Sequence, residues 1–311
     1  MPRARASLTA FLFLLPNLVG FLAFTAGPVL AAFLMTFFTG DFTTRLGDGA
    51  APGAGGGGGI SFEAGFVGLA NYERLARDEE LLRYLGNTLF LMGTIPINVA
   101  FSLGLALLLN QGLRGTTVYR TIFFLPTISS GIALFLIWRW IYSSEVGLLN
   151  AVLASVGIDG PSWLSDAAFA KPALMIMGLW IGMGGYNMVL YLAGLQDIDP
   201  ALYEAAAIDG AGPLATFRHI TWPQLAPTTF FIVVTNVIGG FQVFDQAYVM
   251  TGGGPEGATT TLVYYIYDLL YIRSDAAYAA TVAVALFGLI FAVTVANWYA
   301  GRKLASGAAP A

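Results

Sequence analysis

The sequence predicts an all-α, polytopic membrane protein with six transmembrane helices, and two observations carry that prediction. Of the 311 residues, 57% are hydrophobic and only 10% are charged, whereas a soluble domain typically carries about 25% charged residues. The charged residues are separated by six apolar runs, and a helix needs roughly 20 apolar residues to cross a hydrocarbon core about 30 Å thick. The expected spans are residues 8–38, 84–110, 117–142, 172–195, 223–246 and 276–301.

Basic residues at the two ends of the chain indicate its orientation. Arg3 and Arg5 precede the first span, and Arg302 and Lys303 follow the last. Because basic residues near span ends favour the inner side, we expect both termini to be cytoplasmic and the segment 41–83 to be extracytoplasmic. A signal peptide is the alternative for the N-terminus, but the uncharged run there is too long for an ordinary signal core, which favours an uncleaved helix.

The expected outer segment contains two distinct stretches. Residues 53–59 are rich in glycine and cannot pack a core, so we expect a mobile linker there. Residues 66–72 read Phe-Val-Gly-Leu-Ala-Asn-Tyr and precede a short helix, which we expect Phe66 and Tyr72 to seat at the membrane interface.

One charge, Arg139, lies near the outer end of the third span between Trp138 and Trp140. Tryptophan favours the interface and a guanidinium can reach water from there, so we expect an anchor rather than a mid-membrane charge. Residues 146–158 are apolar but too short to span, which predicts a re-entrant or interfacial helix.

The stretch 199–227, between the fourth and fifth spans, combines helix-capping signals with small residues. Asp199 suits an N-cap, Pro200 suits the first helical position, and Gly210 can end a short helix by taking positive φ. Residues 212–213 repeat the start signal, which predicts a second short helix before the chain re-enters the membrane.

The amino-acid sequence of this stretch resembles that of a known family. Glu204-Ala205-Ala206-x-x-x-Gly210, followed by Ile220-x-x-Pro223, resembles the EAA loop in permease subunits of bacterial ATP-binding-cassette (ABC) sugar importers. The similarity is to the maltose- and glycerol-3-phosphate-type branch of binding-protein-dependent transport. Residues 66–72 and 236–255 are similar to the same family.

The resemblance implies one type I ABC importer transmembrane domain over 1–311, multi-pass in the bacterial cell (inner) membrane, with a cytoplasmic coupling-helix loop at 199–222. The implied partners are a second homologous permease subunit, two ABC ATPase subunits, an extracytoplasmic solute-binding protein, a sugar substrate and membrane lipid. The resemblance places ATP and Mg on the partner ATPase and implies no cofactor and no nucleic acid for this chain. The residues expected to couple to the ATPase are Glu204, Ala205, Ala206, Asp209, Gly210, Phe217 and Arg218.

The fourth and fifth spans hold the polar groups that a sugar path would need. Hydroxyls require amide donors and acceptors, and sugar ring faces require aromatic side chains. The residues expected to line the path are Trp180, Gly182, Tyr186, Asn187, Asn236, Gly240 and Gln242. Two alternatives remain open, since the glycines can serve close helix packing and Asn187 can bond a neighbouring helix. Asp245 is expected to be a charge at the outer interface.

Several absences narrow the function. The sequence contains no Gly-x-x-x-x-Gly-Lys-Ser/Thr segment, His219 is its only histidine and it has no cysteine, so P-loop ATP binding, His-based metal sites and disulfides are not expected. We therefore do not expect an enzyme. An ion-coupled secondary carrier for a small polar solute is the alternative, although such carriers usually place ionisable residues at mid-membrane. Oligosaccharide, monosaccharide and glycerol phosphodiester fit equally as cargo, and the sequence does not say which permease subunit holds the substrate site.

Overall fold

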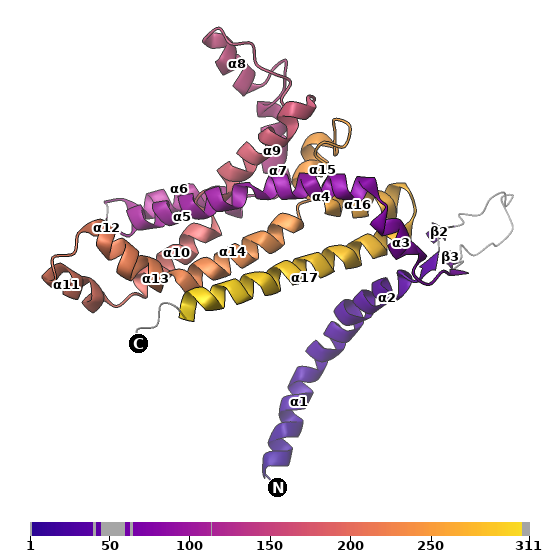
Figure 1. Cartoon of the computed structure of the whole chain (residues 1–311), viewed down its shortest axis with the longest axis horizontal. Coiled ribbons are helices and arrows are strands. Elements are labelled where there is room, and N and C mark those ends of the chain that lie inside the picture. The colour runs from indigo at the N-terminus through magenta and orange to yellow at the C-terminus, as the bar shows by residue number, and fades with distance from the viewer. Residues whose placement is uncertain (1, 40–41, 45–59, 63–64, 113, 307–311) are drawn as a thin grey trace. The chain divides into compact units, whose positions relative to one another are not determined.

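Helices are the dominant elements of the computed structural model, which describes residues 2–39, 42–44, 60–62, 65–112 and 114–306 (Figure 1). The expected glycine-rich linker at 53–59 lies outside the described residues. The chain divides into two compact units, residues 1–79 with 265–287 and residues 80–264 with 288–311.

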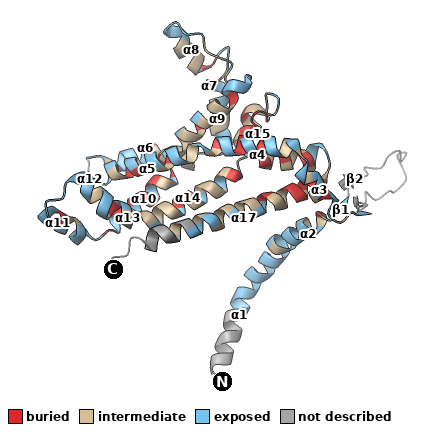
Figure 2. Cartoon of the chain, viewed as in Figure 1, coloured by how far each residue is buried: buried red, intermediate tan, exposed pale blue. Residues whose placement is uncertain are grey.

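The first unit begins with a long apolar helix. It runs through α1 (Pro2–Phe21), the π-helical turn η1 (Leu22–Ala26) and α2 (Gly27–Met35). The π turn lies directly before Gly27 and Pro28, and a proline at the start of α2 supplies no amide donor to the preceding turn. Exposed side chains line the helix from Phe11 onward (Figure 2).

Two short antiparallel ladders follow, which the all-α prediction did not include. Strand β1 (Phe38–Thr39) pairs with β4 (Gly65–Phe66), and β2 (Phe42–Thr44) pairs with β3 (Ile60–Phe62). Phe38 lies opposite Phe66 in the first ladder, with the two ring centroids 5.6 Å apart. The first ladder therefore brings the chain back beside the end of α2.

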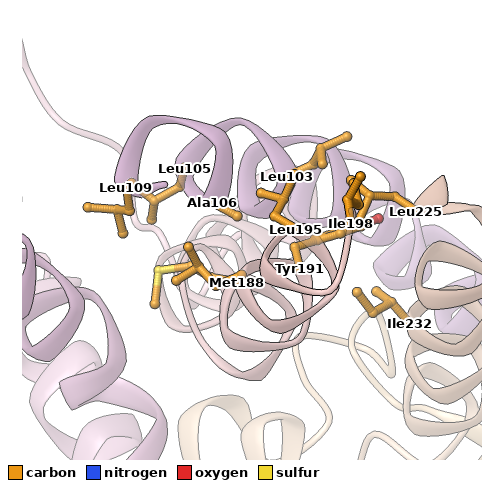
Figure 3. Packing of buried hydrophobic residues seen from close by; sticks show 11 residues of the cluster. Leu103, Leu105, Ala106, Leu109, Met188, Tyr191, Leu195, Ile198, Leu225 and Ile232 are labelled. Atoms are coloured by element: carbon orange, nitrogen blue, oxygen red, sulfur yellow. The ribbon is translucent and has the colours of Figure 1, made fainter. Parts of the chain in front are cut away.

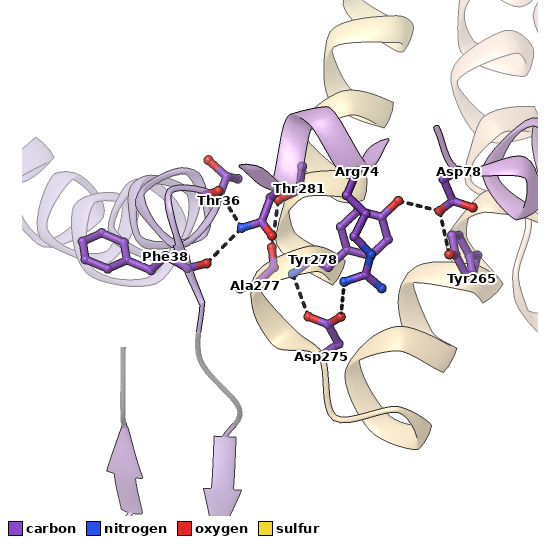
Figure 4. Close-up of polar contacts among 10 residues, drawn as sticks. Thr36, Phe38, Arg74, Asp78, Tyr265, Asp275, Ala277, Tyr278 and Thr281 are labelled. Carbon is purple, nitrogen blue, oxygen red and sulfur yellow. Dashed lines mark hydrogen bonds and ion pairs between the residues drawn. The ribbon is translucent and has the colours of Figure 1, made fainter. Parts of the chain in front are cut away.

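The short helix α3 (Ala70–Ala76) ties the end of α2 into this unit (Figure 4). The Nδ2 of Asn71 donates to the carbonyl oxygens of Thr36 and Phe38, each at 2.9 Å. The hydroxyl of Tyr72 donates to Thr36 Oγ1 at 3.0 Å. Tyr72, expected to seat an interfacial helix, thus also holds the chain that leaves the first span.

The other end of α3 contacts the start of the last span. The guanidinium of Arg74 pairs with Asp275 at 2.6 Å and lies over the ring of Tyr278, 3.7 Å from its centroid. Asp78 accepts hydrogen bonds from the hydroxyls of Tyr265 and Tyr278 (Figure 4). These contacts join α3 to α16 (Leu262–Tyr267), to the turn that includes η3 (Asp268–Ile272) and to α17 (Ala276–Ser306).

The second unit holds most of the helices. They are α4 (Glu79–Met92), α5 (Thr94–Leu109), α6 (Thr116–Ile128), α7 (Gly131–Ile141), α8 (Leu148–Ser155), α9 (Ala167–Gly182), α10 (Tyr186–Gln196), α11 (Pro200–Ile208), α12 (Pro213–Thr216), η2 (Phe217–Thr221), α13 (Trp222–Gln224), α14 (Ala226–Phe241) and α15 (Asp245–Thr251). Among the described residues, four helices are long and apolar enough to cross a membrane, and six spans result if each of two bent pairs counts as one.

The expected single helix over 117–142 is wrong, because α6 and α7 meet at 93°. Pro126 removes an amide donor from the last turn of α6, and Ser129 and Ser130 take extended ψ angles of 154° and 121°, which ends the α6 hydrogen-bond ladder. The apolar character of this segment is as expected, but its path is not.

The expected helix over 223–246 is also shorter in the structure. α14 begins at Ala226 after a 62° bend and ends at Phe241, so Gln242 follows the helix and Asp245 starts α15. The expected helix at 146–158 is present in shortened form as α8.

The core of the second unit lies where α10 packs against α5 and α14 (Figure 3). Its side chains include Leu103, Leu105, Ala106, Leu109, Met188, Tyr191, Leu195, Ile198, Leu225 and Ile232. A Cβ built at Gly194 of α10 would lie only 2.8 Å from Thr228 Oγ1, so the α10 backbone approaches α14 closely. The helices on either side of the 199–224 loop are therefore firmly packed.

Candidate functional site

The loop at 199–224 has the capping geometry that the sequence predicts. Asp199 Oδ1 accepts from the backbone N–H of Ala201 at 2.9 Å, and Pro200 is the first residue of α11. Gly210 takes φ +74°, and the N–H of Ala211 donates back to Ala206 O at 2.9 Å. The predicted N-cap and glycine C-cap of this short helix are both confirmed.

The residues expected to couple to an ATPase divide into an exposed and a packed group. Glu204, Ala205, Asp209, Gly210 and Arg218 are exposed, which suits residues available to another protein. Ala206 is buried.

Phe217 belongs to the packed group, which its expected role as a contact residue did not anticipate. Its half-buried ring packs against the helix core, as do Tyr203 and Ile220. The hydroxyl of Tyr203 lies 3.1 Å from Thr221 Oγ1, a hydrogen bond that ties α11 to η2. This group joins the loop to the spans, and Tyr203, Phe217 and Thr221 also line an open pocket that includes Leu214 at the tip.

Two large apolar side chains at the tip of the loop were not identified from the sequence. Ile208 is 86% exposed and Leu214 is 79% exposed. The sequence signal that could have found them is their position, at the end of one short helix and the start of the next. Residues at the ends of short helices have few neighbours in their own chain. Exposed apolar residues surrounded by charged ones are typical of a protein–protein contact.

The path residues Asn187 and Asn236 are brought together by the fold. Asn187 Nδ2 donates to Asn236 Oδ1 at 3.3 Å, and Asn236 Nδ2 donates to Asn187 Oδ1 at 3.0 Å. Asn236 Nδ2 also donates to Ile232 O at 2.7 Å. The pair joins α10 to α14, so the alternative that Asn187 bonds a neighbouring helix describes this conformation.

The path glycines lie where neighbouring helices approach closely. A Cβ at Gly182 would lie 2.5 Å from Asn98 Nδ2 on α5, and one at Gly240 would lie 2.8 Å from Met92 Cγ. These two glycines allow helix packing and leave no space for a ligand at their own Cα atoms. Between α9 and α10, Gly184 has φ +105°, which breaks the fourth span beside Gly182.

The remaining path residues are exposed. The ring of Trp180 lies 5.5 Å from that of Trp138, and the ring of Tyr186 lies edge-on to Phe124 at 5.5 Å. Gln242 lies just beyond the end of α14 and is exposed. The structure therefore pairs the two asparagines and leaves Trp180 on α9, Tyr186 on α10 and Gln242 after α14 accessible.

Buried polar oxygens add candidates that the sequence analysis missed. They are Asn98 Oδ1, Ser102 Oγ and Thr127 Oγ1, none of which has a hydrogen-bond partner within the described protein. They lie on α5 and α6, and Asn98 and Thr127 face Gly182 and Gly185 near the junction of α9 and α10. Polar residues within otherwise apolar runs were the signal that could have found them.

We predict that the asparagine pair stabilises the helix bundle cooperatively. Asn187→Ala and Asn236→Ala should each lower stability in detergent, and the double variant should lose about 1 kcal/mol less than the sum, because one interaction is removed in all three. Thermal unfolding of the three variants measures this coupling. Thr235→Ala is the control, since Thr235 bonds only carbonyls of its own helix. Strict additivity would show that the pair contributes no interaction energy.

Comparison with solved structures defines the class of protein first. A crystal structure of a bacterial ABC transporter involved in the import of the acidic polysaccharide alginate has a chain that matches over 97% of this chain and 98% of its own, with TM-score 0.81 and 22% identity. This chain therefore shares the fold of that transporter chain.

The family follows from the sequence comparisons. The model of the family described as "binding-protein-dependent transport system inner membrane component" matches residues 98–303, and the chain belongs to that family. It is 37% identical to the lactose transport system permease protein LacF of Rhizobium radiobacter, over 76% of this chain and 82% of that protein. It is 35% identical to the sn-glycerol-3-phosphate transport system permease protein UgpA of Yersinia pestis, over 79% and 83% of the two chains. It is 33% identical to a probable ABC transporter permease, YurN, of Bacillus subtilis, over 92% and 93%.

Proposed function

We propose that this chain is the transmembrane subunit of an ATP-driven, binding-protein-dependent importer for a sugar or a sugar-like solute. The names of the relatives support a carbohydrate or polyol derivative as cargo, since they include lactose and sn-glycerol-3-phosphate permeases. The proposal includes cytoplasmic termini, in keeping with the basic residues at both ends of the sequence.

The exposed loop at 199–224 is the observation that carries the proposal. Its rim bears Glu204, Asp209 and Arg218, its tip bears Ile208 and Leu214, and its base is hydrogen-bonded and packed against α10 and α14. A protein that pushed on the tip would move a rigid element attached to two spans. We infer that an ABC ATPase docks on this loop and that ATP and Mg bind to the ATPase.

In this proposal the chain does mechanical work only. Two ATPase subunits, a second permease subunit and an extracytoplasmic solute-binding protein complete the importer. This chain would form half of the translocation path. Its lining would include Trp180, Tyr186, Asn187, Asn236 and Gln242. The asparagine amides that now bond each other could then bond sugar hydroxyls when α10 and α14 separate. Binding energy that differs between two states is sufficient for such coupling.

Reconstitution in proteoliposomes tests the proposal against the ion-coupled alternative. The chain, with the subunits that co-purify with it, should accumulate a labelled saccharide only when ATP is supplied on the ATPase side and a binding protein on the other. A proton or sodium gradient without ATP should give no accumulation. Accumulation driven by an ion gradient alone would contradict the proposed function.

A further inference from the structure

A polar cavity in the second unit lies apart from the asparagine pair and the coupling loop. It has a volume of about 490 Å³ and lies where the end of α7, the turn before α9 and the end of α15 meet. Small-molecule sites typically fall between roughly 300 and 1,000 Å³, so this cavity is large enough for a sugar unit. The residues that line it include Arg139, Ser143, Ser144, Ser165 and Tyr248.

Arg139 has donors available for a ligand. It was expected to be an anchor at the interface, and among the described residues it donates one long hydrogen bond, 3.4 Å from Nη1 to Val249 O. The nearest acids in the sequence are Glu145, Asp159 and Asp166, and no ion pair joins any of them to Arg139 in the described structure. Asp166 instead caps α9 through the N–H of Ala168 at 2.8 Å. The guanidinium therefore keeps most of its N–H groups and its full charge for another partner.

The rest of the wall suits a hydroxylated molecule. The described structure records no hydrogen bond for the hydroxyls of Ser143, Ser144 and Ser165, and these groups can donate or accept. Val249 to Gly252 at the end of α15 also line the cavity, and the Val249 carbonyl that bonds Arg139 has a second lone pair that can accept from a hydroxyl. On one side the ring of Tyr248 stacks with Phe244, with centroids 5.2 Å apart, and provides a rigid aromatic edge. Carbonyl acceptors would repel a bare anion, whereas a sugar presents hydroxyl donors to them.

We propose that this cavity is a saccharide-binding subsite that selects a unit bearing an acidic group. The carboxylate or phosphate of the sugar would pair with Arg139, and the ring hydroxyls would bond the serines and the carbonyls at the end of α15. The inference rests on the proposed sugar-import function and adds a preference that the asparagine pair does not supply, because amides carry no charge. The subsite would hold the cargo close to the start of the path, since α15 begins three residues after Gln242.

Titration of the purified chain, with the subunits that co-purify with it, tests the subsite. The probes are digalacturonate and its neutral counterpart galactobiose. Tryptophan fluorescence is the readout, because the rings of Trp138 and Trp163 lie 5.3 and 5.8 Å from that of Tyr142, which lines the cavity. A charge-assisted bond predicts about 10-fold or more tighter binding of digalacturonate, with loss of that preference at high salt.

Variants assign the preference to Arg139. Arg139→Gln should remove the discrimination between the two sugars, and Arg139→Lys should retain part of it. Arg114→Gln is the matched control, since Arg114 is exposed in the turn before α6 and does not line the cavity. Equal affinity of the wild-type chain for the two sugars would overturn the proposal, even if a variant failed to fold. Unchanged discrimination in a folded Arg139→Gln protein would do the same.

A lipid phosphate could pair with Arg139 in place of an acidic sugar. Native mass spectrometry distinguishes these two ligands. If phosphatidylglycerol is retained by the wild type, is lost in Arg139→Gln and is not displaced by digalacturonate, the cavity holds lipid and the saccharide subsite is wrong. Displacement of the lipid by digalacturonate but not by galactobiose would support the subsite. ATP-driven uptake of a neutral sugar without any acidic preference would leave the importer function intact and remove this inference alone.

Discussion

Gly210→Pro is expected to abolish uptake while the chain still inserts into the membrane. Gly210 has φ +74°, whereas proline requires φ near −65°, and its N–H donates to Ala207 O at 3.2 Å, a bond that proline cannot make. A cost of about 3 kcal/mol or more is enough to change how α11 ends, and the tip of the loop would then point elsewhere. Uptake in proteoliposomes should fall by about 100-fold or more, since each 1.4 kcal/mol is a factor of ten.

A neighbouring glycine provides the matched control. Gly212 has φ −75°, and a Cβ built there meets no atom within 4 Å, so Gly212→Ala should transport like the wild type. Gly210→Ala should lie between the two, because a left-handed alanine costs roughly 1–2 kcal/mol. Wild-type uptake by Gly210→Pro would mean that the shape of this loop does not matter for transport.

Insertion and orientation can be checked in the same proteins. The chain has no cysteine, so Ile208→Cys would be a unique label at the exposed tip of the loop. An impermeant thiol reagent should reach it only from the cytoplasmic side, in both the wild-type and the Gly210→Pro background. Labelling from the outer side would overturn the proposed orientation and the docking of an ATPase at this loop.

Gly182→Ala is expected to destabilise the protein and to reduce uptake. The added Cβ would lie 2.5 Å from Asn98 Nδ2 and 2.8 Å from its Cγ, closer than real Cβ contacts, and Asn98 is buried on α5. Overpacking of this kind typically costs about 1–3 kcal/mol. Thermal unfolding in detergent and uptake by the reconstituted importer measure the two effects.

Helix α9 also contains Gly178, which provides a control for which the expected change in stability is neutral or of opposite sign. At Gly178 the nearest atom to an added Cβ is Gln246 Oε1 at 3.9 Å, an ordinary contact. Gly178→Ala should therefore be neutral or slightly stabilising, since alanine in a helix interior gains about 0.5–1 kcal/mol over glycine. Asn98→Ala should partly rescue Gly182→Ala. Equal unfolding temperatures for the two alanine variants would show that α9 and α5 are not closely packed at Gly182.

The local elements of this protein could be predicted because each depends on a few neighbouring residues. Asp199 and Gly210 delimit α11 through a cap and a left-handed turn that involve only residues close in sequence. The apolar spans could also be predicted, because crossing a hydrocarbon core requires only a sufficient length of apolar residues and no particular partner helix. The expected docking role of the 199–222 loop remains a prediction.

Bends between helices, and contacts between residues far apart in the sequence, could not be predicted in the same way. Pro126 is present in the sequence, yet the 93° turn between α6 and α7 depends on how the following serines and the neighbouring helices take up the released backbone. Phe217 was expected to contact the ATPase, which remains a prediction, and the structure adds that its ring packs against a core cluster that includes residues of α5, α10 and α14.

The sequence by itself determined that the chain is helical, resides in a membrane, carries a capped loop between two spans and lacks a P-loop for ATP. The tertiary structure decided that Asn187 faces Asn236, that Gly182 lies against Asn98, and that Arg139 opens into a polar cavity. The physical reason is distance along the chain. Caps and hydrophobic length act over a few residues, whereas contacts between helices depend on packing that brings residues 49 or more positions apart into register.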